Sequence, residues 1–123
     1  MSSKRLLLVD DEVDITDALK AALERRGFSV TTFNDPQAAL AAFKPSLYDL
    51  AIIDIRMPKM NGFELYREMR RIDGKANVCF LTAFDIHREE FERMFPDVEV
   101  KAFLKKPITI DNLVARLNEL LEK

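Results

Sequence analysis

The sequence predicts an α/β fold of one domain, in which a parallel sheet is covered by helices on both faces. Five segments with the length and apolar content of strands alternate with segments of helical periodicity along the 123 residues. The connections between them are short, and no low-complexity tract or internal linker separates them. Strands that alternate with helices in this way pair in parallel through right-handed crossovers. We therefore expect a (βα)5 three-layer sandwich that spans residues 1–123 as a single domain.

The bulk composition narrows the class of protein. A hydrophobic content of 48% with 33% charged residues is typical of a folded globular domain. The net charge of −2 gives no electrostatic reason to expect direct binding to nucleic acid or to a membrane surface. The lone cysteine, Cys79, excludes an intrachain disulfide and favours a reducing compartment. Because no apolar run approaches the roughly 20 residues of a membrane span or resembles a signal sequence, we expect a soluble cytoplasmic protein.

The first half of the chain contains two strand–helix units. Residues 5–9 form a continuous apolar run, as expected for a strand covered on both faces. The helix that follows stops at Gly27, and its apolar stripe consists of Ile15, Leu19, Ala22 and Leu23. Residues 29–33 are more polar, which predicts an edge strand. The second helix begins with Asp35 as its cap and Pro36 in its first turn.

The second half contains three further units. Residues 49–54 and 77–83 predict buried strands. In residues 98–104, apolar residues alternate with charged or aromatic ones, which predicts a strand with one face more exposed to solvent. In the helix between the first two of these strands, the side chains of Leu65, Met69 and Ile72 are expected to point inward. Residues 85–95 predict a highly charged fourth helix. The last helix has the clearest apolar stripe of the chain, formed by Ile110, Leu113, Val114, Leu117, Leu120 and Leu121.

Polar side chains follow four of the five predicted strands at their carboxyl ends. These are Asp10 and Asp11 at the end of the first strand, Asp54 at the end of the third, Thr82 at the end of the fourth and Lys106 at the end of the fifth. The second strand, the expected edge, ends in no comparable group. In open parallel sheets, ligands bind beside the carboxyl ends of the strands, near the point where the strand order reverses. We therefore expect these side chains to meet at one site.

This set of side chains favours phosphoryl chemistry with a hard cation. Carboxylates suit Mg²⁺, which proteins hold by a few carboxylates together with water and phosphate oxygens. A carboxylate can also attack a phosphoryl group, and the oxygens of the resulting aspartyl-phosphate then need positive charge or hydrogen-bond donors beside them. We expect Asp10 and Asp11 to hold the cation and Asp54 to be the nucleophile. Lys106 and Thr82 would contact the phosphoryl oxygens.

Four stretches in this order and spacing resemble the receiver (REC) domains of two-component response regulators, the CheY-like family. They are "LLLVDDE", "AIIDIRMPKMNG", "FLTA" and "AFLKKPI", and the resemblance extends from Lys4 to Glu122. It implies a flavodoxin-like five-stranded fold with the strand order 2-1-3-4-5. It also implies that a kinase histidine donates phosphate to an aspartate and that Mg²⁺ is required.

The resemblance assigns roles to individual residues. It makes Asp54 the phosphoacceptor, and it places Asp10 and Asp11 in the acidic pair that binds the metal together with Asp54. Thr82 becomes the switch hydroxyl and Phe103 the aromatic switch residue.

Further assignments concern the rim of the expected site. The family lysine directly precedes a proline, which selects Lys106 over Lys105, and the bond from Lys106 to Pro107 is expected to be cis. Arg56 would supply its backbone carbonyl to the metal. The side chains of Arg56 and Phe84 should border the mouth of the site, where they would restrict the hydrolytic water and slow self-dephosphorylation.

The expected function is a phosphoacceptor signalling switch rather than a classical enzyme. A histidine kinase or a phosphotransfer protein would phosphorylate Asp54, and the domain would assist its own phosphorylation and dephosphorylation. The response of Thr82, Lys106 and Phe103 would alter the face formed by the fourth helix, fifth strand and fifth helix, which would bind an unknown downstream protein. Because the chain stops at Lys123, we expect either a stand-alone receiver or a receiver excised from a longer regulator, as a monomer or a phosphorylation-dependent dimer.

Two other functions are compatible with the same fold. A phosphorylation-independent protein-binding module would not need the site residues, so their intact set argues against it. An aspartyl phosphohydrolase on a related sheet would carry Asp-x-Asp-x-Thr after its first strand, where this chain has "DDEVD". Turnover of a phosphoester would identify the hydrolase, and stoichiometric labelling would identify the receiver.

Taken alone, Asp10 and Asp11 also fit a solvated turn before a helix, and Phe103 fits a core position.

Overall fold

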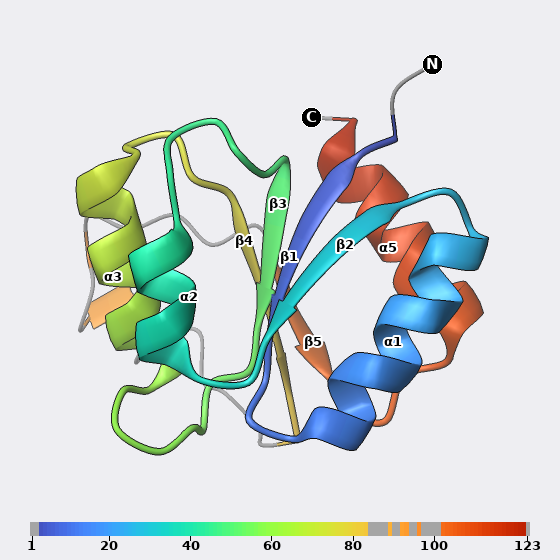
Figure 1. Cartoon of the computed structure of the whole chain (residues 1–123), viewed down its shortest axis with the longest axis horizontal. Coiled ribbons are helices and arrows are strands. Elements are labelled where there is room, and N and C mark those ends of the chain that lie inside the picture. The colour runs from blue at the N-terminus through green and yellow to red at the C-terminus, as the bar shows by residue number, and fades with distance from the viewer. Residues whose placement is uncertain (1–2, 84–88, 90–91, 94–95, 97–101, 123) are drawn as a thin grey trace.

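The computed structural model describes residues 3–83, 89, 92, 93, 96 and 102–122. Within them lies a five-stranded parallel sheet in the order β2-β1-β3-β4-β5, and the described helices pack on its two faces (Figure 1). The predicted three-layer α/β fold and its strand order are confirmed. The expected fourth helix at residues 85–95 lies largely outside the described residues, as does the start of the expected fifth strand at residues 98–101.

Four of the five strands coincide with apolar runs of the sequence, and the second strand is more polar. The strands are β1 (Arg5–Val9), β2 (Ser29–Phe33), β3 (Leu50–Ile53), β4 (Val78–Thr82) and β5 (Ala102–Lys105). All residues of β3 and β4 are buried, because these strands are covered by helices on both faces. The more polar β2 forms an edge of the sheet, as its sequence predicts.

Each described helix except the first begins at a side chain that caps a free backbone N–H group, whereas Glu12 at the start of the first helix makes no such hydrogen bond. The helices are α1 (Val13–Arg25), α2 (Pro36–Ala42), α3 (Gly62–Ile72) and α5 (Ile110–Leu121). The carboxylate of Asp35 accepts from the N–H of Gln37 at the start of α2, and Asn61 and Glu64 form a reciprocal capping box at the start of α3. Among the helices described, none is both long and apolar enough to cross a membrane.

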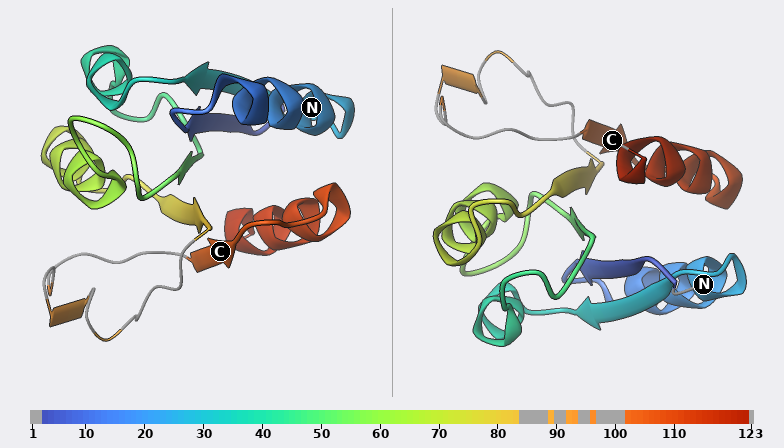
Figure 2. Two further views of the ribbon diagram at one scale, coloured as in Figure 1. Left: turned by 90° about the horizontal axis from the view of Figure 1, so that it is seen from below. Right: turned by 90° about the horizontal axis from the view of Figure 1, so that it is seen from above.

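The interior strands supply two separate hydrophobic cores, one on each face of the sheet. Successive residues of a strand point to opposite faces. Leu7 and Ile53 therefore pack in the core beneath α2 and α3, whereas Leu8 and Ile52 pack in the core beneath α1 and α5. The two views of Figure 2 show the sheet between these two helical layers.

The inward face of α3 differs from the prediction at one position. Leu65 and Met69 are fully buried as expected, but Ile72 is 40% exposed. Ile72 is the last residue of α3, and the apolar contact of the helix with the sheet ends at Met69. Tyr66 occupies the core instead, with its hydroxyl 3.4 Å from the carbonyl oxygen of Ala76. The expectation that Ile72 points inward is therefore wrong.

The strand register brings distant parts of the chain together at the carboxyl edge of the sheet. Val9, at the end of β1, lies opposite Phe33 of β2 on one side and opposite Ile53 of β3 on the other. The residues that follow these three strands are consequently neighbours, which places Asp10 beside Asp54.

Candidate functional site

A pocket of about 340 Å³ opens at the carboxyl edge of the sheet. It is lined by residues that follow β1, β3, β4 and β5, namely Asp11, Glu12, Asp54, Arg56, Ala83 and Lys106. Three carboxylates and two cationic side chains thus share one solvent-accessible hollow, although they come from three separate segments of the chain.

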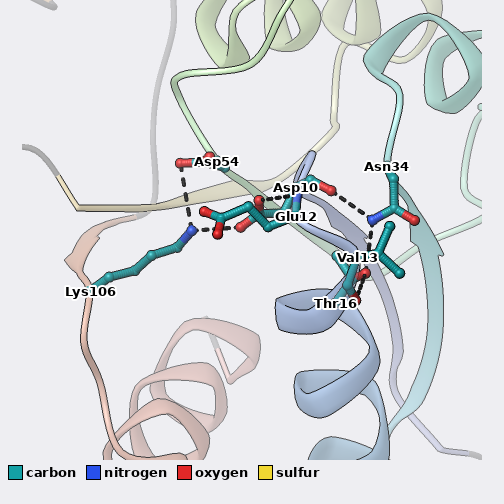
Figure 3. A network of polar contacts seen from close by, with 7 residues as sticks. All are labelled: Asp10, Glu12, Val13, Thr16, Asn34, Asp54 and Lys106. Atoms are coloured by element: carbon teal, nitrogen blue, oxygen red, sulfur yellow. Dashed lines mark hydrogen bonds and ion pairs between the residues drawn. The ribbon is translucent and has the colours of Figure 1, made fainter.

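Lys106 lies between the two buried aspartates of this edge (Figure 3). Its Nζ is 2.6 Å from Oδ2 of Asp10 and 3.9 Å from Oδ1 of Asp54. Asp10 is only 2% exposed, and an unpaired carboxylate at that depth would be strongly unfavourable. The positive partner that the buried acid requires is therefore supplied by the chain itself. It is Lys106 rather than its exposed neighbour Lys105.

Asp54 is buried directly after β3. Its backbone N–H donates to the carbonyl of Val9 at 2.9 Å, and the residue is 8% exposed. Burial raises the pKa of the Asp54 carboxyl to about 6; the charge of Lys106 opposes this rise, whereas the charges of Asp10 and Asp11 add to it. The ionised site thus concentrates negative charge that a further cation would neutralise.

Three consecutive carboxylates form a tight acidic group at this edge. Ligand oxygens of Asp10, Asp11 and Glu12 lie within 4.8 Å of one another. Asp54 is outside this group and is linked to Asp10 through the ammonium of Lys106. Because carboxylate oxygens are the ligands that Mg²⁺ prefers, the donor chemistry of the pocket fits that ion. The sequence shows Glu12 as the third acid of "LLLVDDE", but the strand-end argument does not select it.

Thr82 and Lys106 are joined through the backbone at the ends of β4 and β5. The N–H of Lys106 donates to the carbonyl of Thr82 at 2.8 Å. Thr82 is the last residue of β4 and is 2% exposed, and Ala83 after it lines the pocket. The two residues that carry the predicted hydroxyl and ammonium are thus joined by a main-chain hydrogen bond at the edge of the sheet.

Phe103 is partly buried on the face of the sheet that α3 covers. Its ring stacks on the ring of Phe80, with centroids 5.5 Å apart and an interplanar angle of 27°. Phe80 in turn meets the ring of Phe63 edge-on, with centroids 5.0 Å apart. A row of three aromatic rings therefore connects β5 through β4 to the first turn of α3.

The other predicted residues lie at the rim. Arg56 is exposed and lines the pocket. The peptide bond between Lys106 and Pro107 is cis, the form that the resemblance implies. Phe84 lies outside the described residues, so its predicted place at the mouth of the site stays a prediction.

Comparison with known families decides which class of domain carries this site. The family model of the response regulator receiver domain matches residues 6–118. The chain belongs to this family. Receiver domains are signalling phosphoacceptors of two-component systems rather than classical enzymes, and phosphorylation and Mg²⁺ binding at an acidic site are typical of them. They interact with histidine kinases and with downstream effectors.

Known relatives of this receiver domain include longer regulators and isolated receiver domains. The transcriptional regulatory protein TrcR of Mycobacterium tuberculosis is 34% identical over 97% of this chain and 46% of its own length. The CpxR homolog of Haemophilus influenzae is 35% identical over 97% of this chain and 51% of its own length. The chain thus spans about half the length of the curated relatives it matches.

Solved receiver structures share its architecture. A CheY-like receiver domain from Methanospirillum hungatei superposes with a TM-score of 0.85 at 26% identity, covering 98% of this chain and 95% of that one. The response regulator TrrA of Thermotoga maritima, solved in complex with Mg²⁺ and BeF, gives 0.78 at 31% identity, covering 95% and 98%.

One residue at the site of this receiver domain is missed by sequence reasoning. Asn34 directly follows β2, and its Nδ2 donates to the carbonyl of Asp10 and to Oγ1 of Thr16, both at 2.8 Å (Figure 3). The second strand thus ends in a polar residue that contacts Asp10, although Asn34 does not line the pocket itself. The sequence does place an asparagine immediately after the expected edge strand, but a side-chain contact to a backbone carbonyl leaves no pattern that would reveal it.

Proposed function

We propose that this receiver domain is a magnesium-dependent phosphoacceptor switch in which Asp54 receives a phosphoryl group from a histidine kinase or a phosphotransfer protein. The observation that carries this proposal is the position of the Lys106 ammonium, 2.6 Å from Asp10 and 3.9 Å from Asp54. From that place it can pair with an oxygen of a phosphoryl group on Asp54.

Two members of the acidic group would hold the metal together with Asp54. The ligands would be the carboxylates of Asp10, Asp11 and Asp54 and the backbone carbonyl of Arg56. A bound Mg²⁺ supplies positive charge to the phosphoryl oxygens during transfer. This set of ligands is supported by the pocket that Asp11 and Asp54 line together.

In the transfer itself, a carboxylate oxygen of Asp54 attacks the phosphorus atom of the donor phosphohistidine. An O–P bond forms as the P–N bond breaks, and the electron pair of the broken bond stays on the imidazole nitrogen. The attacking oxygen must be ionised. Since burial raises the pKa of Asp54 to about 6, the carboxylate form predominates at pH 7 and a cation in the pocket would increase its share. Lys106 and the Thr82 hydroxyl would stabilise the charge on the phosphoryl oxygens.

The proposed output begins at Thr82 and Phe103. The added negative charge on Asp54 would draw the Thr82 hydroxyl and Lys106 toward it, and the ring of Phe103 would turn further inward over Phe80. β5 and α5 would then present an altered surface, together with the expected fourth helix, to a downstream protein. Under this proposal the domain acts as a monomer or as a phosphorylation-dependent dimer.

The central test is the mass of the intact protein after incubation with an acyl phosphate and Mg²⁺. We expect a gain of one phosphoryl group that disappears when EDTA replaces the metal. The gain should be absent in Asp54→Asn and unchanged in Asp17→Asn, which removes an exposed carboxylate from α1. No gain in the wild type would instead favour a phosphorylation-independent binding module, and a gain that survives Asp54→Asn would place the phosphoryl group elsewhere.

Arg56 and Phe84 would set the lifetime of the phosphoryl group. Arg56 supports this idea because its side chain lines the pocket beside Asp54, where it can obstruct the water that attacks the phosphorus atom. We expect Arg56→Asn and Phe84→Ala to speed the loss of the phosphoryl group, measured by mass after removal of the phosphodonor. Decay at the wild-type rate in both variants would contradict this assignment.

A further inference from the structure

We propose that Asn34 and Thr16 are positioning residues that hold the acidic segment of residues 10–12 in its metal-binding form, an inference that rests on the proposed function. Neither residue lines the pocket. Both act through backbone atoms at the two ends of that segment, and both belong to the network drawn in Figure 3.

The first contact fixes the backbone of Asp10. Its N–H donates to the carbonyl of Phe33 at 3.2 Å, as the last rung of the β1–β2 ladder. A continued parallel ladder would next bring a backbone N–H from residue 35 to the Asp10 carbonyl, but the chain turns there so that Asp35 caps α2. Nδ2 of Asn34 supplies the missing donor at 2.8 Å. Two consecutive residues thus hold both polar backbone groups of Asp10.

The second contact fixes the other end of the acidic segment. Nδ2 of Asn34 also donates to Oγ1 of Thr16 at 2.8 Å, and this hydroxyl donates to the carbonyl of Val13 at 3.0 Å. Thr16 is fully buried, so its hydroxyl has to find its partners within the protein. The amide uses both of its N–H donors, and the hydroxyl both accepts and donates. One amide group therefore anchors Asp10 at one end and, through Thr16, Val13 at the other.

The anchoring leaves the carboxylates available. Because Asn34 and Thr16 bond to backbone atoms at the ends of the segment, they occupy no carboxylate oxygen of Asp11 or Glu12. They would also limit how far the segment can move when a bound metal displaces Lys106 from Asp10. Partners of this kind, which orient metal ligands without touching the metal, typically change metal affinity about 10- to 100-fold when they are lost. We expect an effect at the lower end of that range, because the contacts are to the backbone.

The experiment is an Mg²⁺ titration followed by amide chemical shifts, with thermal unfolding of the metal-free protein measured in parallel. Asn34→Ala and Thr16→Val should raise the Mg²⁺ dissociation constant about tenfold. Thr16→Ser keeps the hydroxyl and should stay close to the wild type. Asn118→Ala and Thr31→Val make the same chemical changes at exposed positions and should leave the dissociation constant unchanged.

Each outcome decides the inference. A lower melting temperature with an unchanged dissociation constant in Asn34→Ala would reduce the residue to a structural role and overturn the proposal. So would an equal loss of affinity in Thr16→Ser and Thr16→Val. If Asn34→Ala does not fold, the comparison of Thr16→Val with Thr16→Ser decides the question. A wild-type protein that binds no Mg²⁺ at millimolar concentration would overturn the proposed function as well, whereas unaffected variants of a binding wild type would overturn this inference alone.

Discussion

Lys106 pairs more closely with Asp10, at 2.6 Å, than with Asp54, at 3.9 Å. In the metal-free protein the lysine therefore occupies part of the space in which a cation would meet the acidic group. Under the proposed function, metal and ammonium would compete for Asp10, and a metal that took over this carboxylate would leave the lysine available to a phosphoryl group on Asp54.

The first prediction follows from this competition. Lys106→Met should bind Mg²⁺ more tightly than the wild type, by about fivefold if the displaced ion pair is worth about 1 kcal/mol. Its metal-free form should be less stable, because the buried carboxylate of Asp10 then has no positive charge paired with it and keeps only the hydrogen bond from the N–H of Glu12. Calorimetric titration with MgCl₂ and denaturant unfolding in EDTA measure the two effects. Lys105→Met is the matched control, since it removes an exposed ammonium one residue away. Equal or weaker affinity in Lys106→Met would refute the competition.

The second prediction concerns the dependence of stability on pH. The pKa of Asp54 is about 6 in the folded protein, raised mainly by burial from 3.8, so the folded state binds this proton more tightly than the unfolded state. The ionised carboxylate consequently destabilises the metal-free fold above pH 6, and the effect disappears as the pH falls toward 4. Asp54→Asn should therefore exceed the wild type in unfolding free energy by about 1 to 3 kcal/mol at pH 8, and by much less at pH 4.

Denaturant unfolding at a series of pH values in EDTA provides this measurement. Asp49→Asn is an instructive control because its pKa is lowered, chiefly by the hydrogen bond from the backbone of Arg5. Loss of that carboxylate should destabilise the protein at neutral pH, and the difference should shrink as the pH falls below 4. A pH-independent gap between Asp54→Asn and the wild type would contradict the prediction for Asp54.

The third prediction concerns the close approach of α3 to the backbone that directly follows β3. A Cβ atom on Gly62 would lie 2.5 Å from the carbonyl oxygen of Asp54 and 2.9 Å from Cα of Ile55. Gly62→Ala must therefore displace backbone at the site, and we expect a loss of about 2 kcal/mol in unfolding free energy. Gly74→Ala places its Cβ in open space and should change stability by less than about 1 kcal/mol, in either direction. Equal effects of the two substitutions would show that the backbone beside Asp54 yields easily.

The fourth prediction uses the absence of tryptophan from the sequence. Phe103→Trp introduces a single reporter at the end of the aromatic row formed with Phe80 and Phe63. Addition of beryllofluoride and Mg²⁺ should shift its emission to shorter wavelength as the ring turns inward. The shift should be lost in the double variant that also carries Thr82→Ala. An unchanged emission wavelength in a Phe103→Trp protein that is shown to bind beryllofluoride would rule out the proposed movement.

The fifth prediction concerns Cys79, which is fully buried in β4. Burial raises the pKa of its thiol to about 12, so the reactive thiolate is scarce at pH 8. Native protein should react with a maleimide far more slowly than protein in denaturant, as measured by mass. Rapid labelling of the native protein would show that this part of β4 opens readily.

Much of the fold and of the candidate site is predictable because the sequence patterns that indicate them are local. The apolar runs mark the strands, and polar residues at their ends mark the carboxyl edge where Asp54 and Lys106 meet. The role of Asn34 is not local, since it depends on the register that sets Val9 opposite Phe33. The exposure of Ile72 likewise depends on where the helix leaves the sheet, which helical periodicity does not encode.

The division of the interior into two cores has an evolutionary consequence. Ile52 and Ile53 are consecutive, yet one belongs to the core beneath α1 and α5 and the other to the core beneath α2 and α3. Substitutions that accumulate in one core can reshape the helices above it while the other core is left intact. The two helical surfaces of the domain can therefore change independently in evolution, while the carboxyl edge of the sheet between them stays the same.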